Sequence, residues 1–235
     1  MNRGLIQAAQ SMANAELRVS SIAANLANVS TPGFKRQTTA LQRFELPHLP
    51  NQTPRAVLVP KTDVAFSQGS LAQTGREMDL ALRGEGFFVV DDQSQGTLLT
   101  RNGVFMLRED GNIVNDYGQP LAWKRRSGLL DQLLPVEVNT LGEVRQEGEL
   151  KGLLDIRAYA NPQDLQMNAA GDWIARDDAP ELPPDVEVLQ GFLEKSNASA
   201  VDQLVGMISA QRSYERNAQV IQSIAENYQR LSRPS

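Results

Sequence analysis

The sequence has no cysteine, one histidine and no excess of positive charge, and these gaps exclude several classes of protein. Without cysteine there is no disulfide framework, thiol nucleophile or thiolate metal site. The one histidine, His48, stands in the proline-rich stretch LPHLPNQTP, which is typical of a solvated loop. A formal net charge of −5 gives no basic footprint for nucleic acid. We therefore expect no enzyme, no catalytic residue, no cofactor, no metal ligand and no nucleic-acid partner.

Long hydrophobic runs are also missing. No stretch approaches the ~20 apolar residues that a membrane span requires. The N-terminal stretch MNRGLIQAAQSMANAELRVS has spaced apolar residues instead of the compact apolar core of a secretory signal. We expect no membrane insertion, and either a cytoplasmic chain or export by a route that uses no cleaved signal peptide.

The first 29 residues of the chain carry a heptad spacing of apolar residues. Steps of three and four residues continue for four heptads, which predicts a long helix with a narrow apolar seam. The seam consists of Leu5, Ala8, Met12, Ala15, Val19, Ile22, Leu26 and Val29. It stops within ANLANVSTPGFKR, where Pro32 and Gly33 predict the end of the helix.

The C-terminus has a matching pattern. Ser199 and Asp202 fit a helix start of the Ser-x-x-acid type. The seam that follows consists of Ala200, Leu204, Met207, Gln211, Tyr214, Ala218, Ile221, Ala225 and Tyr228, and it is widened in places by Val201, Val205, Ile208, Val220, Ile224 and Leu231. Periodicity alone favours two interpretations equally: a helical hairpin packed on a core, or a coiled coil whose partners include other subunits.

The middle of the chain is typical of short strands. Asn102-Gly103 and Asp110-Gly111 are strong tight-turn signals between apolar runs. Gly84-Glu85-Gly86 lacks the third glycine and the following helix that a nucleotide-binding loop needs. Because strand-like residues follow it, we interpret this stretch as a bulge or bend between two strands.

These patterns predict an α+β fold, in which long N- and C-terminal helices form a coiled-coil-like helical layer and the centre is an all-β domain. The expected segments are an N-terminal helix at 1–31, an extended linker and β connection at 32–76, a central β-domain at 77–190 and a C-terminal helix at 191–235.

Several stretches together resemble the bacterial flagellar axial proteins, the group of rod, hook and hook–filament junction proteins. They are ANLANVSTPGFKR, MDLALRGEGFFVV, LTRNGVFMLREDGNIVNDYGQPL and LQGFLEKSNASAVDQLVGMISAQRSYERNAQVIQSIAENYQRL, in the order that the family has them. Within the family the chain resembles a rod protein. The short span before Gly84 suggests the proximal rod member, with the distal member as the near alternative.

The resemblance implies a structural subunit of the flagellar rod, the axial drive shaft of motility. Such a subunit is exported by the type III apparatus without a cleaved signal and polymerises with itself and with adjacent proximal and distal rod proteins into a helical tube in the periplasm. The assembly residues expected on this basis are Leu5, Met12, Val19, Ile22, Asn25, Leu26, Asn28, Val29, Phe34, Leu204, Met207, Gln211, Tyr214, Ile221 and Tyr228. Pro32, Gly33, Gly84 and Gly86 are the expected joint and turn residues.

Two roles within that interface stay open. Asn25 and Asn28 either satisfy backbone groups at the helix end or donate hydrogen bonds to a neighbour. Phe34 is expected to insert into an apolar groove of its own or a neighbouring subunit, with Lys35 and Arg36 positioned for acidic partners. Alternative functions are a periplasmic cell-wall-acting or carbohydrate-binding β-protein and a non-flagellar secreted filament subunit.

Overall fold

The computed structural model describes residues 3–45, 56–92, 94, 96–168, 171–176 and 179–231. The chain forms two compact units, each built from segments far apart in the sequence. The first unit comprises Met1–Val29, Arg36–Ala65 and Ala198–Ser235, and the second comprises Ser30–Lys35 and Phe66–Asn197. The one histidine of the sequence, His48, lies outside the described residues.

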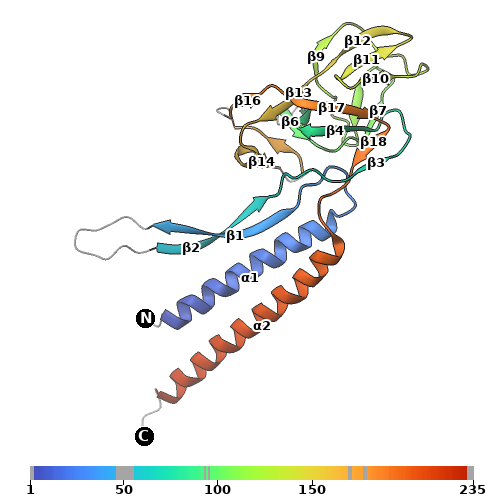
Figure 1. The fold of residues 1–235 in the computed structure, drawn as a ribbon. Helices are drawn as coiled ribbons and strands as arrows, with labels where there is room; N and C mark the ends of the chain where they lie inside the picture. The colour runs from blue at the N-terminus through green and yellow to red at the C-terminus, as the bar shows by residue number, and fades with distance from the viewer. Residues whose placement is uncertain are drawn as a thin grey trace. The chain divides into compact units, whose positions relative to one another are not determined.

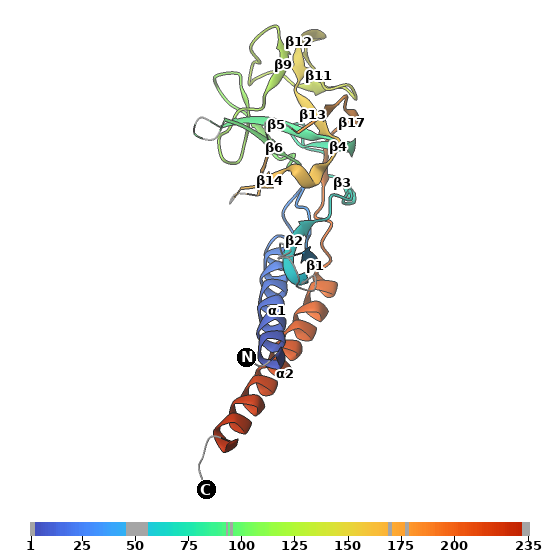
Figure 2. The same cartoon turned by 90° about the vertical axis from the view of Figure 1, so that its left-hand side faces the viewer.

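The first unit consists of two helices and a β-hairpin. Its elements are α1 (Arg3–Ala27), β1 (Gln37–Glu45), β2 (Ala56–Val64) and α2 (Ala200–Leu231). β1 and β2 are antiparallel, with a register that runs from Gln37 opposite Val64 to Glu45 opposite Ala56. Figures 1 and 2 show α1 beside α2, with the hairpin lying along α1.

Small residues form the contact between the two helices. Ala15 and Ile22 of α1 and Ala210 of α2 are buried. A Cβ atom added at Gly206 would lie 3.3 Å from Cδ1 of Ile22, so that glycine allows the helices to approach closely. Close approach replaces the interlocking of large side chains that a coiled-coil seam requires.

Asn25 connects three elements of this unit. Its Nδ2 donates to the Gln37 carbonyl (2.8 Å) and to Oε1 of Gln203 (3.0 Å), and its Oδ1 accepts from the Gln37 amide (2.8 Å). The side chain of Asn25 therefore pairs with the first residue of β1 as a neighbouring strand would. One turn earlier, Ser21 Oγ and Thr39 Oγ1 form a second contact of 3.0 Å.

Side chains satisfy backbone groups at the helix ends. Near the end of α1, the Nδ2 of Asn28 donates to the Ala24 carbonyl (2.9 Å), which also accepts from the Asn28 backbone amide (3.2 Å). At the start of α2, Ser199 Oγ accepts from the Asp202 amide (3.4 Å), as the Ser-x-x-acid pattern predicts.

The second unit is built almost wholly of short strands. They are β3 (Leu71–Gln73), β4 (Leu80–Glu85), β5 (Phe87–Asp92), β6 (Gly96–Thr100), β7 (Phe105–Leu107), β8 (Ile113–Asn115), β9 (Trp123–Arg126), β10 (Glu137–Val138), β11 (Glu143–Gln146), β12 (Glu149–Leu154), β13 (Ile156–Tyr159), β14 (Gln166–Met167), β15 (Trp173–Ile174), β16 (Glu181–Leu182), β17 (Asp185–Gln190) and β18 (Phe192–Glu194), with a 3₁₀ turn η1 at Pro162–Asp164.

These strands form a six-stranded sheet in the order β14-β15-β6-β5-β13-β16, a four-stranded sheet β10-β11-β12-β9, and the pairs β17-β4, β18-β3 and β7-β8. Their shared core contains Leu80, Leu82, Phe88, Val90, Leu98, Phe105, Ile113, Leu121, Leu130, Val136, Val138, Val144, Leu154 and Val188. Four consecutive residues of β5, FFVV, are buried, which is typical of a strand covered on both faces. β5 is therefore the central strand that positions its neighbours.

The predicted fold class is wrong. The chain is largely β-rich, because the described residues hold eighteen short strands and only two α-helices. The long terminal helices do not form a coiled-coil-like layer: α1 ends at Ala27, and two predicted seam residues of α2, Leu204 and Tyr214, are exposed. The heptad spacing failed because small and polar side chains make the helix contact and a β-hairpin covers part of α1.

Residues 32–76, which the sequence predicts to be an extended linker and β connection, contain the hairpin and β3. The four segment boundaries stay a prediction. Among the described residues, neither helix is long and apolar enough to span a membrane.

Candidate functional site

Two chain segments, 33–34 and 194–197, run next to each other in the second unit. The Gly33 amide donates to the Glu194 carbonyl (2.8 Å), and the Asn197 amide donates to the Phe34 carbonyl (3.3 Å). Gly33 has a φ of +70°, and a Cβ atom there would lie 2.2 Å from the backbone of Arg101. Only glycine fits this position, because any side chain would meet backbone atoms.

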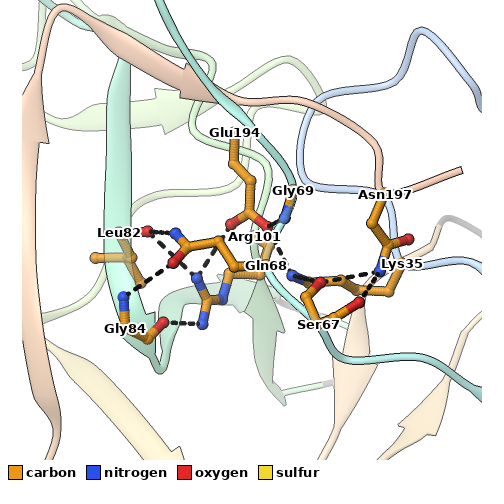
Figure 3. Close-up of polar contacts among 9 residues, drawn as sticks. All are labelled: Lys35, Ser67, Gln68, Gly69, Leu82, Gly84, Arg101, Glu194 and Asn197. Carbon is orange, nitrogen blue, oxygen red and sulfur yellow. Dashed lines mark hydrogen bonds and ion pairs between the residues drawn. The ribbon is translucent and has the colours of Figure 1, made fainter.

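A cluster of three charged residues, Lys35, Arg101 and Glu194, lies beneath these segments; we call it the ion cluster. Glu194 Oε1 accepts from Nζ of Lys35 at 2.6 Å, and its Oε2 pairs with NH1 of Arg101 at 3.1 Å. The three residues are 2%, 6% and 2% exposed, in sequence order. Figure 3 shows both cations reaching the one carboxylate. Burial this deep requires that the charges be paired.

Backbone groups complete the coordination of the ion cluster. The Gly69 amide donates to Oε1 of Glu194 (2.8 Å), and Lys35 Nζ donates to the Ser67 carbonyl (3.1 Å). NH2 of Arg101 donates to the Gly84 carbonyl (2.6 Å). Because these partners lie on segments around residues 35, 67–69, 84, 101 and 194, the cluster connects five separate stretches of the second unit.

The electrostatics of the ion cluster are unbalanced. Burial lowers the pKa of the Lys35 ammonium, the attraction and hydrogen bond of Glu194 oppose that change, and repulsion from Arg101 adds to it. Burial likewise lowers the pKa of the Arg101 guanidinium against the attraction of Glu194. Two cations thus face one carboxylate within hydrogen-bonding distance.

The chemistry that the cluster offers is ion pairing and hydrogen bonding. It contains no hydroxyl or thiol next to a base, which nucleophilic catalysis requires. Among the described residues, no group of three or more His, Cys, Asp or Glu side chains could hold a metal ion. The arrangement therefore fits a structural connection between the ends of the β-unit.

Sequence reasoning missed most of this cluster. It placed Lys35 only as a cation for acidic partners, and it did not single out Arg101 or Glu194. The three positions are up to 159 residues apart and share no periodicity, so no local sequence pattern connects them. One signal was present in the sequence. A lysine that directly follows a Pro-Gly turn and an aromatic residue could have indicated that this lysine is buried and has a partner of opposite charge.

The joint residues lie in the second unit as follows. Phe34 and Pro32 are half-buried, and Gly33 is buried. Gly84 has a φ of +111° near the end of β4, and a Cβ atom at Gly86 would lie 2.9 Å from Cγ1 of Val186. Both glycines allow close approach of β17, which pairs with β4.

The assembly residues predicted on α1 fall into two groups. Ile22 and Asn25 are buried against elements of their own unit. Met12, Val19, Leu26, Asn28 and Val29 are half-buried, and Leu5 belongs to α1 with its side chain outside the described residues. For Asn25 and Asn28, the contacts of the single chain already use the side-chain amides.

On α2 the predicted residues lie mostly toward solvent. Leu204, Gln211 and Tyr214 are exposed, Met207 and Ile221 are half-buried, and Tyr228 belongs to α2 with its side chain outside the described residues. These positions stay a prediction as assembly contacts.

A more exposed apolar surface lies on another face of α2. Val201, Val205 and Ile208 are 70%, 63% and 52% exposed, and their spacing of four and three residues puts them on one face. We call these three residues the α2 patch. A groove of about 530 Å³ continues from Val205 and Ile208 along Arg212 and Arg216. The sequence pattern assigned these three valine and isoleucine residues to the edge of the seam, whereas the structure leaves them uncovered.

Comparison with known proteins gives matches over most of the chain. Three family models match: "Flagella basal body rod protein" at residues 6–35, "Flagellar hook protein FlgE/F/G D1 domain" at 81–172, and "Flagellar basal body rod FlgEFG protein C-terminal" at 189–233. Their order along the chain matches the α1, β-unit and α2 segments.

Individual relatives match along nearly their whole length. The chain is 32% identical over 216 residues to the flagellar basal-body rod protein FlgF of Caulobacter vibrioides, covering 87% of this chain and 86% of that protein. It is 27% identical to FlgF of Mesorhizobium japonicum (90% and 89% covered) and 28% identical to FlgG of Agrobacterium fabrum (95% and 96% covered). FlgF and FlgG proteins therefore match to a similar degree.

Proposed function

Because this chain belongs to the family of flagellar basal-body rod proteins, as a proximal or distal member, we propose that it polymerises with neighbouring rod subunits into a helical tube in the periplasm. It is a structural subunit of the rod, and it acts without catalysis, cofactor or nucleic acid. It reaches its place through the flagellar type III export apparatus.

The observation that carries the polymerisation proposal is the α2 patch. Three large aliphatic side chains in two turns of one helix are more than half exposed. A contiguous exposed apolar surface of this kind marks a site of protein contact. Contacts between one surface of a subunit and a different surface of the next do not close on themselves, so they build a helical polymer.

The arrangement of the first unit supports the same proposal. Ile22, Asn25 and Ala210 are already buried within one chain, and the side chain of Asn25 has its hydrogen-bond partners there. The faces left for other subunits are then the exposed ones, which include the α2 patch and the apolar residues Leu41 and Phe44 of β1. Each subunit thus offers several separate contacts, which suits a shaft that carries torque.

The test replaces the α2 patch with charge. Val205→Glu and Ile208→Glu, each introduced into cells that lack the native copy, are expected to abolish swimming in soft agar, because an unpaired carboxylate would be buried at the contact. Gln222→Glu is the matched control, since it adds the same charge to an exposed position of α2 farther from the patch. It is expected to preserve swimming.

Purified variants should keep the circular dichroism spectrum of the native chain, because the patch contributes nothing to the buried core. Native swimming by both patch variants would contradict the proposal. An equal loss of swimming in the patch variants and in the Gln222→Glu control would contradict the proposal as well.

A further inference from the structure

The outward faces of the two helices of the first unit differ in side-chain size. α2 presents the α2 patch, whose three side chains are large, aliphatic and more than half exposed. α1 presents a face of exposed and mostly small residues, spaced three and four apart and therefore on one side of the helix. We call it the α1 face, and it consists of Ala13, Glu16, Ser20, Ala23 and Ala27.

The α1 face and the α2 patch point away from each other within one chain. At about 100° per residue, the α1 face lies opposite the buried residues Ser21, Ile22 and Asn25. The α2 patch likewise lies opposite the buried residues Gln203 and Ala210. A single chain therefore cannot cover one face with the other, whereas a row of chains can, because each contact leaves one face of each kind free for the next.

Contacts within one chain fix the level of one helix against the other. A Cβ atom at Gly206 would lie 3.3 Å from Cδ1 of Ile22, and Asn25 Nδ2 donates to Oε1 of Gln203. The helices therefore run antiparallel, and each step of one residue forward on α1 corresponds to one step back on α2 (Figure 1).

This register gives each large side chain of the α2 patch a small residue of the α1 face at its own level. The pairs at equal level are Val201 with Ala27, Val205 with Ala23, and Ile208 with Ser20. Large side chains of one helix pack well where a second helix offers small residues and lets the backbones approach. The two surfaces are therefore complementary in shape when adjacent chains stand side by side at the same height.

Charge continues the match one turn farther along the helices. Arg212 follows the α2 patch on the same side of α2, and its level on α1 is that of Glu16. Both side chains are exposed, and no ion pair among the described residues includes either of them. Glu215, the next charge on this side of α2, lies at the level of the uncharged Ala13. Opposite charges at matched positions select the partner and fix the register.

We propose that the α2 patch of one chain packs against the α1 face of a second copy, in the same orientation and without a shift along the helices, so that Arg212 of one copy pairs with Glu16 of the next. The pairing rests on the proposed function, and it names the surface that receives the α2 patch. Because the two faces differ, the contact repeats without closing on itself.

Engineered disulfides test the register, since the native chain has no cysteine. The variant Ala23→Cys/Val205→Cys puts two thiols at facing positions of adjacent copies, where a disulfide needs Cα atoms within about 7 Å of each other. Oxidation of purified basal bodies is expected to convert most of this chain into a ladder of multimers on a non-reducing gel.

The matched control is Ala23→Cys/Gln219→Cys. Gln219 is exposed on the same side of α2 as Val205. It lies roughly 21 Å farther along the helix, so the yield of multimers is expected to be at least about tenfold lower. The variants Ala23→Cys and Val205→Cys, each alone, are expected to give no multimers, because like faces do not meet.

Exchange of the charged pair gives a second test that needs no cysteine. Glu16→Arg and Arg212→Glu, each alone, place like charges opposite each other across the contact. Each is expected to lower the number of copies per basal body about tenfold. The combined variant rebuilds the pair with reversed polarity and is expected to restore that number to within about twofold of the native chain.

Four results would overturn the pairing. They are a ladder no stronger than that of the Gln219 control, multimers from a single-cysteine variant, cross-links to a different protein only, and a combined charge exchange that is no better than either single change. With any of them, the native chain is still found in basal bodies, so the proposed function would stand. Absence of the native chain from basal bodies would contradict the proposed function itself, and the pairing with it.

Discussion

Glu194→Gln is expected to lower the free energy of unfolding of the second unit by about 3–5 kcal/mol. The substitution keeps the shape of the side chain but removes the one carboxylate that pairs with Lys35 and Arg101. Two buried cations would then face each other with a neutral amide between them. Urea denaturation followed by the fluorescence of Trp123 and Trp173, which both belong to the second unit, measures the loss.

The matched control for that variant is Glu187→Gln. Glu187 pairs with Arg83 at 2.8 Å, and both side chains are more than half exposed, so loss of this pair is expected to cost less than about 1 kcal/mol. If Glu194→Gln were no more destabilising than Glu187→Gln, the ion cluster would not stabilise the unit and its structural role would be wrong.

Asn25→Ala is expected to destabilise the first unit by about 2–3 kcal/mol, since the Gln37 amide and carbonyl and the Gln203 side chain would all lose a partner. The alanine keeps or improves helix propensity, so any loss arises from the lost hydrogen bonds. Hydrogen exchange is the suitable measurement, because it reports on each unit separately. The Gln37 amide should exchange faster, roughly 30- to 150-fold at that loss of free energy.

Asn28→Ala provides the comparison within the same helix. The Asn28 side chain donates to a carbonyl of its own helix, so its removal is expected to cost less than about 1.5 kcal/mol and to leave exchange at Gln37 nearly unchanged. Equal exchange at Gln37 in native and Asn25→Ala chains would show that Asn25 does not connect β1 to α1.

Local signals in the sequence predicted part of the local structure, although Asn102-Gly103, the other tight-turn signal, does not form a turn between paired strands. Asp110-Gly111 predicts a tight turn, and Gly111 adopts a φ of +75° in the connection between β7 and β8. Ser199 predicts the start of α2 at the next residue. In both cases a few adjacent residues determine the backbone conformation, through glycine's freedom at positive φ or through a side chain that satisfies an end amide.

The β1–β2 hairpin could not be predicted in the same way. The proline-rich character of the region from 46 to 60 favoured an extended linker, yet Pro60 lies within β2 opposite Leu41. A two-stranded hairpin leaves each strand with an unpaired edge, and proline is tolerated at an edge. What the hairpin needs as well is contact with α1 through Asn25 and Ser21, and the sequence pattern does not contain that information.

The heptad spacing misled for a related reason. A period of 3.5 residues shows which positions share a helix face. It does not show whether that face packs against large side chains of another helix, against a strand or against small residues. Here Ala15, Ala210 and Gly206 allow close packing, while Leu204 and Tyr214 are exposed. The family resemblance, by contrast, needed only the order of matching stretches and was confirmed by the comparisons.

The most direct test of the structural role is the protein content of purified flagellar basal bodies from cells that make the native chain or the Ile208→Glu variant. Quantitative mass spectrometry is expected to find several copies of the native chain per basal body, because a helical polymer repeats its subunit. The Ile208→Glu chain should be absent from basal bodies while present in the cells. A native chain that is present in cells but absent from basal bodies would contradict its assignment as a rod subunit, and a variant that is incorporated like the native chain would contradict assembly through the α2 patch.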